Sequence, residues 1–393
     1  MIHINKITKE QLLNNLVDRE IVIHFPDDDI PDITDENIVY ESMVLDRSIV
    51  SGNELKFGGG ISSQFKIKVI DINTELKGKN IEVSLICTVR PLLYPSEDLF
   101  PSEDLFPCGG THTIEYRLFT GKIDSALRLK NRAVKEIIAF DAFYNDSKYV
   151  YDFMTSFAVY SGNASLYSIR DAIENKLGYD TEGQFFNDST ALSMTLENTK
   201  KTIKMNTTTT TDVLKAYAEL NASFAIMDRF NKLRFIQLLS DEKETITYHS
   251  DLEWEEYETA DINAIKVAYS GESEKYYVYG HSAEKPSVYT ASDNLIARCC
   301  SDVSGLVTAF NDNRGNNYLF GNIYKYRPFK AVLFDYWWLE PGDRVDIETD
   351  AEDTPVVSSF VFNVSISGIR NIKTTINADG KQYLGKEEVS DAV

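Results

Sequence analysis

The sequence has few cysteines that could cross-link the chain and no long apolar run that could anchor it in a membrane. Its 393 residues include 4 cysteines, Cys87, Cys108, Cys299 and Cys300, without a CxxC pair. The adjacent Cys299 and Cys300 are too close for an ordinary structural disulfide. No stretch reaches the roughly 18 apolar residues of a membrane span, and the amino-terminal segment lacks the apolar core of a signal peptide. We therefore expect reduced thiols in a chain made in a cytoplasm, with no membrane embedding.

Positive charge is also scarce. The chain has 40 Lys and Arg against 61 Asp and Glu, which gives a formal net charge of −21. The longest basic run is Lys200-Lys201. Because a surface of this sign repels phosphate backbones, the composition argues against a protein that grips duplex DNA.

The usual signatures of catalysis and metal binding are missing. No two of the five histidines stand four residues apart, the spacing that places two metal ligands on one helix face. No GxSxG motif marks a nucleophilic serine. The run Gly58-Gly59-Gly60 lacks the following Lys-Ser/Thr of a phosphate loop, so a β-bulge or close packing explains it better. We predict no catalytic, cofactor or metal site and no enzymatic activity.

Two acidic clusters leave alternatives open. Asp27 to Asp29 stand near Asp32 and Asp35, and a second group comprises Glu253, Trp254, Glu255, Glu256 and Glu258. In a chain this acidic, a solvated face is the expected role for both. Calcium binding and a glycosidase that uses paired carboxylates remain as alternatives.

The chain is rich in strand formers, with 22 Tyr and 21 Phe. Apolar and polar residues alternate over residues 1–145 and again over 241–393, which predicts two barrel-like β domains. The first includes two strands expected on either side of a turn at Gly121. The fold class is therefore mixed β, with a small α/β domain inserted between the two barrels at 146–240.

Two helices and a hairpin define the α/β insert. One helix is expected to start at Ser168 and end at Gly178, with Ile169, Ala172, Ile173 and Leu177 on its buried face. The second opens near Thr210, Thr211 or Asp212, any of which could cap it. The segment that follows predicts a β-hairpin with its turn at 228–232. A weak helix is expected within 301–313.

Several exposed apolar residues are candidates for partner contact. The hexapeptide PSEDLF occurs twice in succession within 95–106. Each proline argues against a central strand, and each Leu-Phe pair places two apolar side chains on an otherwise acidic loop. We predict a surface strap that docks on its own or a neighbouring subunit, and a loop that binds a ligand independently is the alternative. Aromatic side chains elsewhere could serve the same purpose, although a buried turn is the stronger interpretation for the tryptophan pair. The interface candidates are Leu99, Phe100, Leu105, Phe106, Tyr276, Tyr277, Trp337 and Trp338.

Three stretches resemble, in pattern and order, the baseplate hub or tail-tip hub of long-tailed bacteriophages and phage-tail-like particles. They are residues 32–69, with SGNELKFGGG; 207–238, with a helix followed by NKLRFIQL; and 324–349, with YRPF and EPGDRVDIET, followed by 365–380. In the third stretch, Pro341-Gly342 forms a turn that starts the next strand at Asp343.

The resemblance implies an assembly role in the virion tail. Hubs of this family are trimers whose two barrel-like domains per chain match a sixfold tail tube to a threefold spike or tip fibre. They contact the tube or distal tail protein and surround the end of the tape-measure protein, while DNA passes through the lumen without specific binding. Longer relatives append a peptidase or cell-wall hydrolase after the hub region, and we expect none in this chain. A carbohydrate-recognising receptor-binding or distal-tail protein is the alternative function.

Overall fold

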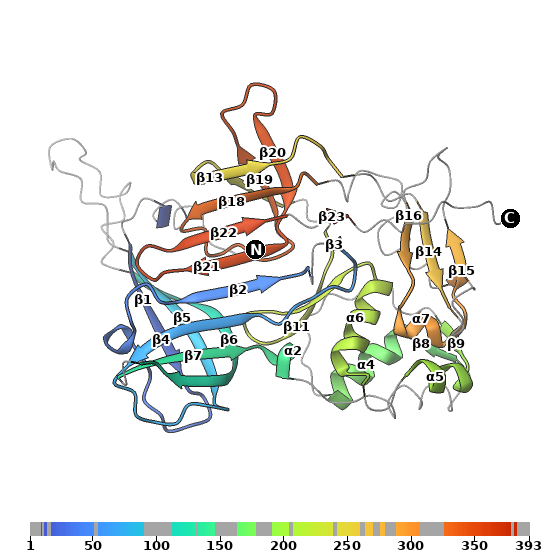
Figure 1. Cartoon of the computed structure of the whole chain (residues 1–393), viewed down its shortest axis with the longest axis horizontal. Coiled ribbons are helices and arrows are strands. Elements are labelled where there is room, and N and C mark those ends of the chain that lie inside the picture. The colour runs from blue at the N-terminus through green and yellow to red at the C-terminus, as the bar shows by residue number, and fades with distance from the viewer. Residues whose placement is uncertain are drawn as a thin grey trace, which may run out of the picture.

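The computed structural model describes residues 9, 12–13, 17–50, 54–89, 112–130, 133–145, 163–177, 191–203, 207–238, 242–259, 264–269, 276–279, 288–305, 326–378 and 381–382. Strands outnumber helices in these ranges, so the predicted mixed β fold is confirmed. The chain has a large β part and a smaller lobe that carries most of the helices (Figure 1).

The β part is dominated by one antiparallel sheet of ten strands (Figure 1). In spatial order the strands are β1 (Val17–His24), β5 (Asn80–Val89), β6 (His112–Arg128), β7 (Val134–Phe140), β4 (Gln64–Ile70), β2 (Val44–Ser48), β21 (Asn363–Ser367), β22 (Lys373–Asn377), β18 (Phe329–Phe334) and β13 (His249–Trp254).

Period-two patterning explains why these segments form strands. In β4 and β7 every second side chain is buried, so that one face of each strand packs on the core. The strands of the first third meet those of the last third where β2 pairs with β21, Val44 opposite Ser367 and Ser48 opposite Asn363. The two β-rich segments that the sequence predicted thus share one sheet.

A smaller sheet projects from the large one. It contains β12 (Lys243–Ile246), β19 (Arg344–Glu348) and β20 (Val356–Phe360), with β19 in the middle. The turn between β19 and β20 forms the projecting end at the top of Figure 1. Two very short strands, β3 (Glu54–Leu55) and β23 (Lys381–Gln382), pair in parallel.

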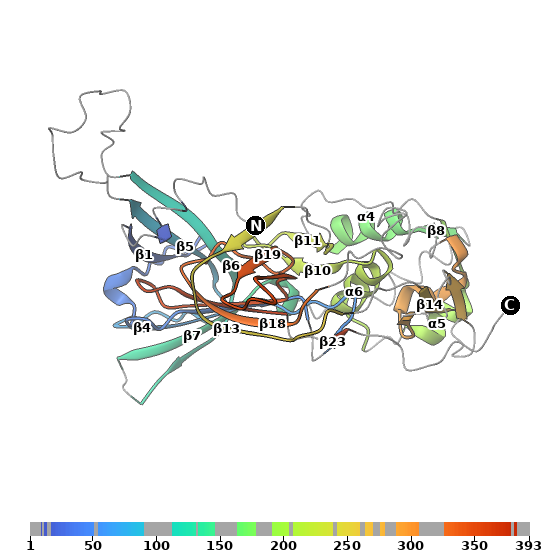
Figure 2. The same cartoon turned by 90° about the horizontal axis from the view of Figure 1, so that it is seen from above.

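The second lobe contains short helices and two three-stranded sheets (Figure 2). Its helices are α4 (Leu166–Leu177), α5 (Leu196–Thr202), α6 (Thr210–Leu220) and α7 (Leu295–Cys299). Its sheets, in spatial order, are β17 (Cys300–Asp302), β9 (Ala191–Met194) and β8 (Asn163–Ser165), and β15 (Tyr276–Tyr279), β14 (Ala264–Ala268) and β16 (Val288–Ala291). Because β17 pairs with β9, strand pairing crosses the domain boundary expected at residue 240.

The predicted hairpin is confirmed. β10 (Phe224–Met227) pairs with β11 (Leu233–Ile236), with the turn at 228–232. The hairpin lies between the lobe and the large sheet, beside the short helix α2 (Ala142–Asn145) (Figure 1). Buried apolar side chains of the β part, hairpin and lobe form one continuous core.

Helix boundaries differ from the prediction at their first turns. The cap of α6 is Thr209, whose hydroxyl accepts a hydrogen bond from the Asp212 backbone N–H while the Asp212 carboxylate accepts one from the Thr209 N–H. Ser168 does not cap α4, because the helix begins at Leu166 and the Ser165 hydroxyl accepts from the Ser168 N–H. Helix α7 was not predicted, because its five residues are too few to show a helical period. Residue 178 and most of the weak helix expected within 301–313 lie outside the described residues.

The turn expected at Gly121 is wrong, since β6 continues through it from His112 to Arg128. A Cβ atom at Gly121 would lie 2.4 Å from both the Phe119 ring and the Phe140 carbonyl oxygen. The glycine therefore serves a close approach of neighbouring groups within the sheet, which is the other common reason for glycine in a strand.

Candidate functional site: a buried junction of arginines and glutamate

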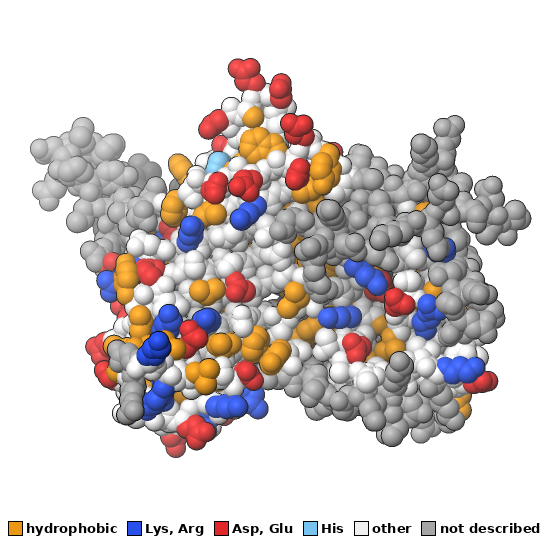
Figure 3. Space-filling view, viewed as in Figure 1, with side chains coloured by type: hydrophobic (Ala, Val, Ile, Leu, Met, Phe, Trp, Pro, Cys, Tyr) orange, Lys and Arg blue, Asp and Glu red, His pale blue; other side chains and the backbone are white. Residues whose placement is uncertain are grey.

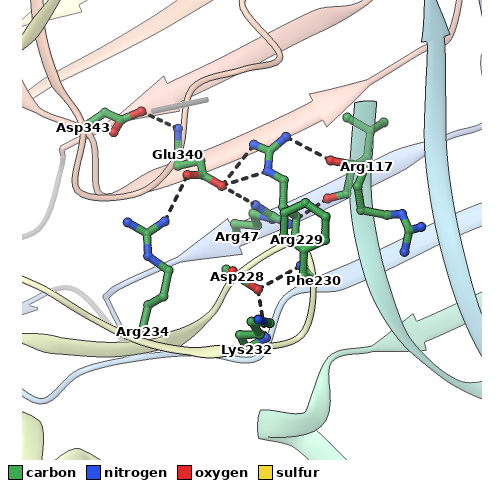
Figure 4. A network of polar contacts seen from close by, with 10 residues as sticks. Arg47, Arg117, Asp228, Arg229, Phe230, Lys232, Arg234, Glu340 and Asp343 are labelled. Carbon is green, nitrogen blue, oxygen red and sulfur yellow. Dashed lines mark hydrogen bonds and ion pairs between the residues drawn. The ribbon is translucent and has the colours of Figure 1, made fainter. Parts of the chain in front are cut away.

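A cluster of charged side chains joins the large sheet, the hairpin and the loop before β19 (Figure 4). Glu340 in that loop accepts from Arg229 of the hairpin turn, with both Nε and Nη2 at 3.0 Å from Oε1. Arg47 of β2 approaches the same oxygen at 3.2 Å, and Arg234 of β11 lies 3.5 Å from Oε2. One carboxylate thus joins three segments that are distant in sequence.

The hairpin turn places Arg229 by local hydrogen bonding. Asp228 Oδ1 accepts from the backbone N–H groups of Phe230 and Lys232, each at 2.8 Å (Figure 4). Asn231 adopts a left-handed φ of 62°, which asparagine tolerates better than most residues. The turn is therefore closed by its own side chain, and Arg229 points inward.

The Pro341-Gly342 turn places Glu340. The Glu340 N–H donates to Asp343 Oδ2 at 2.8 Å, and the Gly342 N–H donates to the Val361 carbonyl at 2.7 Å. Gly342 has φ of +93°, and a Cβ there would lie 2.3 Å from Ile236 Cγ2 on the hairpin. Glycine is needed for both reasons.

The cluster is ionised although it is buried. Burial raises the pKa of Glu340, but Arg229 and Arg47 outweigh it and hold the pKa well below its usual range. Burial, together with Arg229, lowers the pKa of Arg47 to about 10, which still leaves it charged at neutral pH. Further guanidinium N–H groups donate to backbone carbonyls of β6, from Arg47 to Leu118 at 2.7 Å and from Arg229 to Arg117 at 3.1 Å.

This arrangement acts as a structural joint. Glu340 is only 7% exposed, and its carboxylate oxygens are occupied by arginines of the same chain. Because of this packing, a reacting group could not approach the Glu340 carboxylate. The sequence alone did not reveal the cluster, since up to 293 residues separate its partners; the only local signal was the turn that follows Glu340.

The predicted tryptophan pair is part of the core. Trp337 and Trp338 are both 0% exposed, and the Trp337 ring lies 4.8 Å from the ring of Tyr116 on β6. Trp338 Nε1 donates to Glu244 Oε1 at 3.3 Å. Their indoles do not reach the surface of this chain, in agreement with the buried turn that was the stronger interpretation and against a role as interface side chains in this conformation.

The other interface candidates are described in part or not at all. Tyr276 and Tyr277 lie in β15, although their side chains are outside what the structure describes. Leu99, Phe100, Leu105 and Phe106 lie outside the described residues, as does the whole PSEDLF repeat. Their contact with a partner stays a prediction.

The acidic clusters behave as surface groups with local partners. Asp28 pairs with Lys79, Asp27 accepts from Asn80 at 2.6 Å, and Asp35 accepts from the Ile21 N–H at 3.1 Å. Glu253 and its neighbours Glu255 and Glu256 are exposed. Among the described residues, no group of three or more His, Cys, Asp or Glu side chains could hold a metal ion. No helix in those residues is both long and apolar enough to cross a bilayer.

The Gly58 to Gly60 loop packs tightly against α6 and β10. A Cβ on Gly58 would lie 2.3 Å from the Lys215 carbonyl oxygen, and one on Gly60 would lie 2.1 Å from that of Ala225. Close packing, one of the two explanations offered from the sequence, therefore accounts for these glycines.

A cavity of about 390 Å³ lies beside this glycine loop. The buried Glu219 lies at its edge and accepts from the Tyr289 hydroxyl at 2.7 Å and from the Asn294 amide at 2.8 Å. Burial raises the pKa of this carboxyl. With both oxygens bonded within the chain, Glu219 ties α6 to β16 and α7.

Comparison with solved structures identifies the fold. The 43 kDa tail protein of prophage MuSo2 from Shewanella oneidensis matches with a TM-score of 0.50 and 9% identity, over 91% of this chain and 97% of that one. A tail protein from Neisseria meningitidis MC58 matches at 0.47 with 12% identity, over 92% and 97% of the two chains. A chain of a PdpA–VgrG complex matches at 0.43 with 11% identity, over 95% and 67%.

No protein-family model matches the sequence, and no curated protein matches it either. At these identities the likeness concerns the fold alone. The chain has the fold of a prophage tail protein along nearly its whole length.

Proposed function

We propose that this protein is a structural component of the tail of a phage or phage-tail-like particle, and more specifically its baseplate or tail-tip hub. The observation that carries the proposal is the fold shared with the MuSo2 tail protein over 91% of this chain. That match extends through both β-rich segments and the helical lobe between them. The sequence patterns at 32–69, 207–238 and 324–349 resemble the hub family in the same order.

The hub proposal requires three copies around the tail axis. Two β modules per chain then occupy six positions and match the sixfold tail tube, while the threefold axis matches a central spike or tip fibre. Six strands of the ten-stranded sheet come from residues 17–140 and four from 249–377, and we assign one module to each group. The other partners are the distal tail protein and the end of the tape-measure protein.

The role is one of assembly without catalysis. The buried junction at Glu340 fixes the relative placement of sheet, hairpin and loop, as a load-transmitting tail component requires. Three copies would carry three times −21, or −63, and an acidic lumen would let DNA pass without adhering. We assign the protein to the virion tail and its synthesis to the bacterial cytoplasm.

The alternative is a receptor-binding or distal-tail protein that recognises carbohydrate. It gained support from the tryptophan and tyrosine clusters, which could stack on sugar rings. Since Trp337 and Trp338 are 0% exposed, this support is lost for the tryptophans.

Mass photometry and electron microscopy of the purified full-length chain test the proposal. We expect a threefold ring with pseudo-sixfold density around a central opening. A chain that stays monomeric at micromolar concentration and does not bind tail-tube protein would contradict the hub role. Cleavage of peptidoglycan or peptide by the same preparation would contradict the absence of catalysis.

A further inference from the structure

Two surfaces of opposite charge lie at opposite ends of the β part. The first is the turn between β19 and β20, where Asp350, Glu352 and Asp353 are all exposed. No Lys or Arg occurs between residues 348 and 356. In Figure 3 acidic side chains gather at this projecting end, at the top of the view. We call this turn the acidic tip.

The acidic tip has a defined shape. The Thr349 N–H donates to the Pro355 carbonyl at 2.9 Å, and the Thr349 hydroxyl donates to the Thr354 carbonyl. The Ala351 N–H in turn donates to the Thr349 hydroxyl at 3.2 Å. Because these bonds hold the backbone, the three carboxylates are presented together without a large loss of conformational entropy on binding.

The second surface is a cavity of about 350 Å³ between the ends of β6 and β7 and the turn at 73–77. It is lined by three cationic side chains, Lys77, Arg128 and Lys135, and by one carboxylate, Glu75. We call it the basic pocket. In a chain with net charge −21, a concave site in which cations outnumber carboxylates departs from the average of the sequence.

The chain itself holds the cations of the basic pocket in place. Lys135 is buried, and its ammonium donates to the Thr74 carbonyl at 2.7 Å, while Arg128 Nη2 donates to Asn73 Oδ1 at 3.4 Å. Burial, and then the nearby Arg128, lowers the pKa of Lys135. Cations that repel each other in this way are stabilised by an incoming anion.

Each surface also carries an exposed apolar residue beside its charges. Leu127 on the wall of the basic pocket is 61% exposed, and Val356 next to the acidic tip is 42% exposed. An apolar contact surrounded by opposite charges is the usual composition of a specific protein interface.

We propose that the acidic tip of one copy of this chain docks in the basic pocket of a second copy. The turn between β19 and β20 projects at the top of Figure 1, whereas the end of β6 and the start of β7 lie at its lower left, so the two surfaces meet only between molecules. A contact between two different surfaces is heterologous and closes into a ring when the rotation between copies permits. This inference rests on the proposed threefold hub, for which it supplies the subunit contact.

Charge exchange tests the contact. The tip variant is Glu352→Lys with Asp353→Lys, and the pocket variant is Lys77→Glu with Arg128→Glu; buried Lys135 is left intact so that folding is preserved. Since each variant reverses two charges at every subunit contact, it should weaken assembly on the order of tenfold in mass photometry at low salt. Combining all four substitutions should restore assembly.

The matched control carries the same charge change elsewhere, as Glu255→Lys with Glu256→Lys, and should assemble like the wild type. If the tip and pocket variants also assemble like the wild type, or the combination fails to restore assembly, the docking contact is wrong while the hub role stands. If the wild type stays monomeric in mass photometry, the proposed hub role is wrong, and the docking contact that rests on it is wrong as well. Circular dichroism of each variant verifies that it is folded.

Discussion

Arg19 on β1 and Asp335 directly after β18 form an ion pair, with Arg19 Nη2 3.0 Å from Asp335 Oδ1. These strands are the first and ninth in the order of the large sheet. The sheet therefore curls until side chains of these distant strands meet, and we call this contact the seam. In the described residues side chains form the seam, and β1 and β18 are not paired by backbone hydrogen bonds. Arg19 also donates to the Leu12 carbonyl at 2.9 Å.

The seam should make stability depend on pH. Burial raises the pKa of Asp335 from 3.8 to about 6, although Arg19 opposes the shift. A carboxyl whose folded pKa is raised contributes stability that is fully present below pH 3.8 and is lost as pH rises through about 6. The shift corresponds to at most about 3 kcal/mol.

Asp335→Asn is the test of this contribution. Urea unfolding of wild type and variant between pH 4 and pH 7 should show the wild type losing stability relative to the variant as pH rises. Taking the difference between the two proteins removes the contribution of every other titrating group. Parallel stability curves over this interval would show that Asp335 does not titrate there.

Removing the central carboxylate of the buried junction should be costly. Glu340→Gln leaves Arg47 and Arg229 buried without their counter-ion, and breaking a buried pair in this way costs about 3–5 kcal/mol of unfolding free energy. Exposed Glu253→Gln is the control and should change stability by less than about 0.5 kcal/mol. Equal urea midpoints for the two variants would contradict the assignment of Glu340 as a joint.

The arginines around Glu340 should not be equivalent. Arg229 has a side chain only 9% exposed and two 3.0 Å contacts, whereas Arg234 is 26% exposed and lies 3.5 Å away. Arg229→Met should therefore lower the unfolding free energy by more than Arg234→Met. Urea titration of both variants gives the order, and a larger loss for Arg234→Met would contradict it.

The Pro341-Gly342 turn should not tolerate a side chain. Gly342→Ala introduces both a strained positive φ and a clash with Ile236. Gly78→Ala is the matched control, since Gly78 has φ of +80° but nothing within 4 Å of the added carbon. We expect a loss of about 1 kcal/mol for Gly78→Ala and clearly more for Gly342→Ala, measured by urea unfolding. Equal losses would mean that packing against Ile236 is unimportant.

The cap of α6 should be worth about 1 kcal/mol. Thr209→Ala removes the hydroxyl that accepts from the Asp212 N–H, so this backbone donor at the start of the helix loses its hydrogen-bond partner. Thr207→Ala, at an exposed position just before the cap, should leave the thermal midpoint unchanged. A similar loss in both variants would point to the threonine run as a whole and away from the capping box.

Local patterns in the sequence were sufficient for much of the fold. Alternation predicted the strands around Phe65 and Ile137, and the turn residues at Asp228 and Asn231 predicted the hairpin. Gly121 misled the prediction, because a glycine that avoids a steric clash within a strand is indistinguishable in one sequence from a glycine that makes a turn.

Long-range partners could not be read from the sequence. Nothing near Val44 indicates that it pairs with Ser367, and nothing near Arg47 indicates Glu340. The pairing of β17 with β9 has the same character, since both strands are short and their register is set only by tertiary packing. The candidate site was missed for this reason.

The pairing of β2 with β21 has a consequence for synthesis. While the ribosome extends the chain, β2 has its partner β4 on one side but must wait for residues 363–367 before the other side is paired. An unpaired strand edge of this kind is open to pairing with a neighbouring nascent chain. Slower elongation or a bound chaperone during that interval should therefore raise the yield of correctly folded protein.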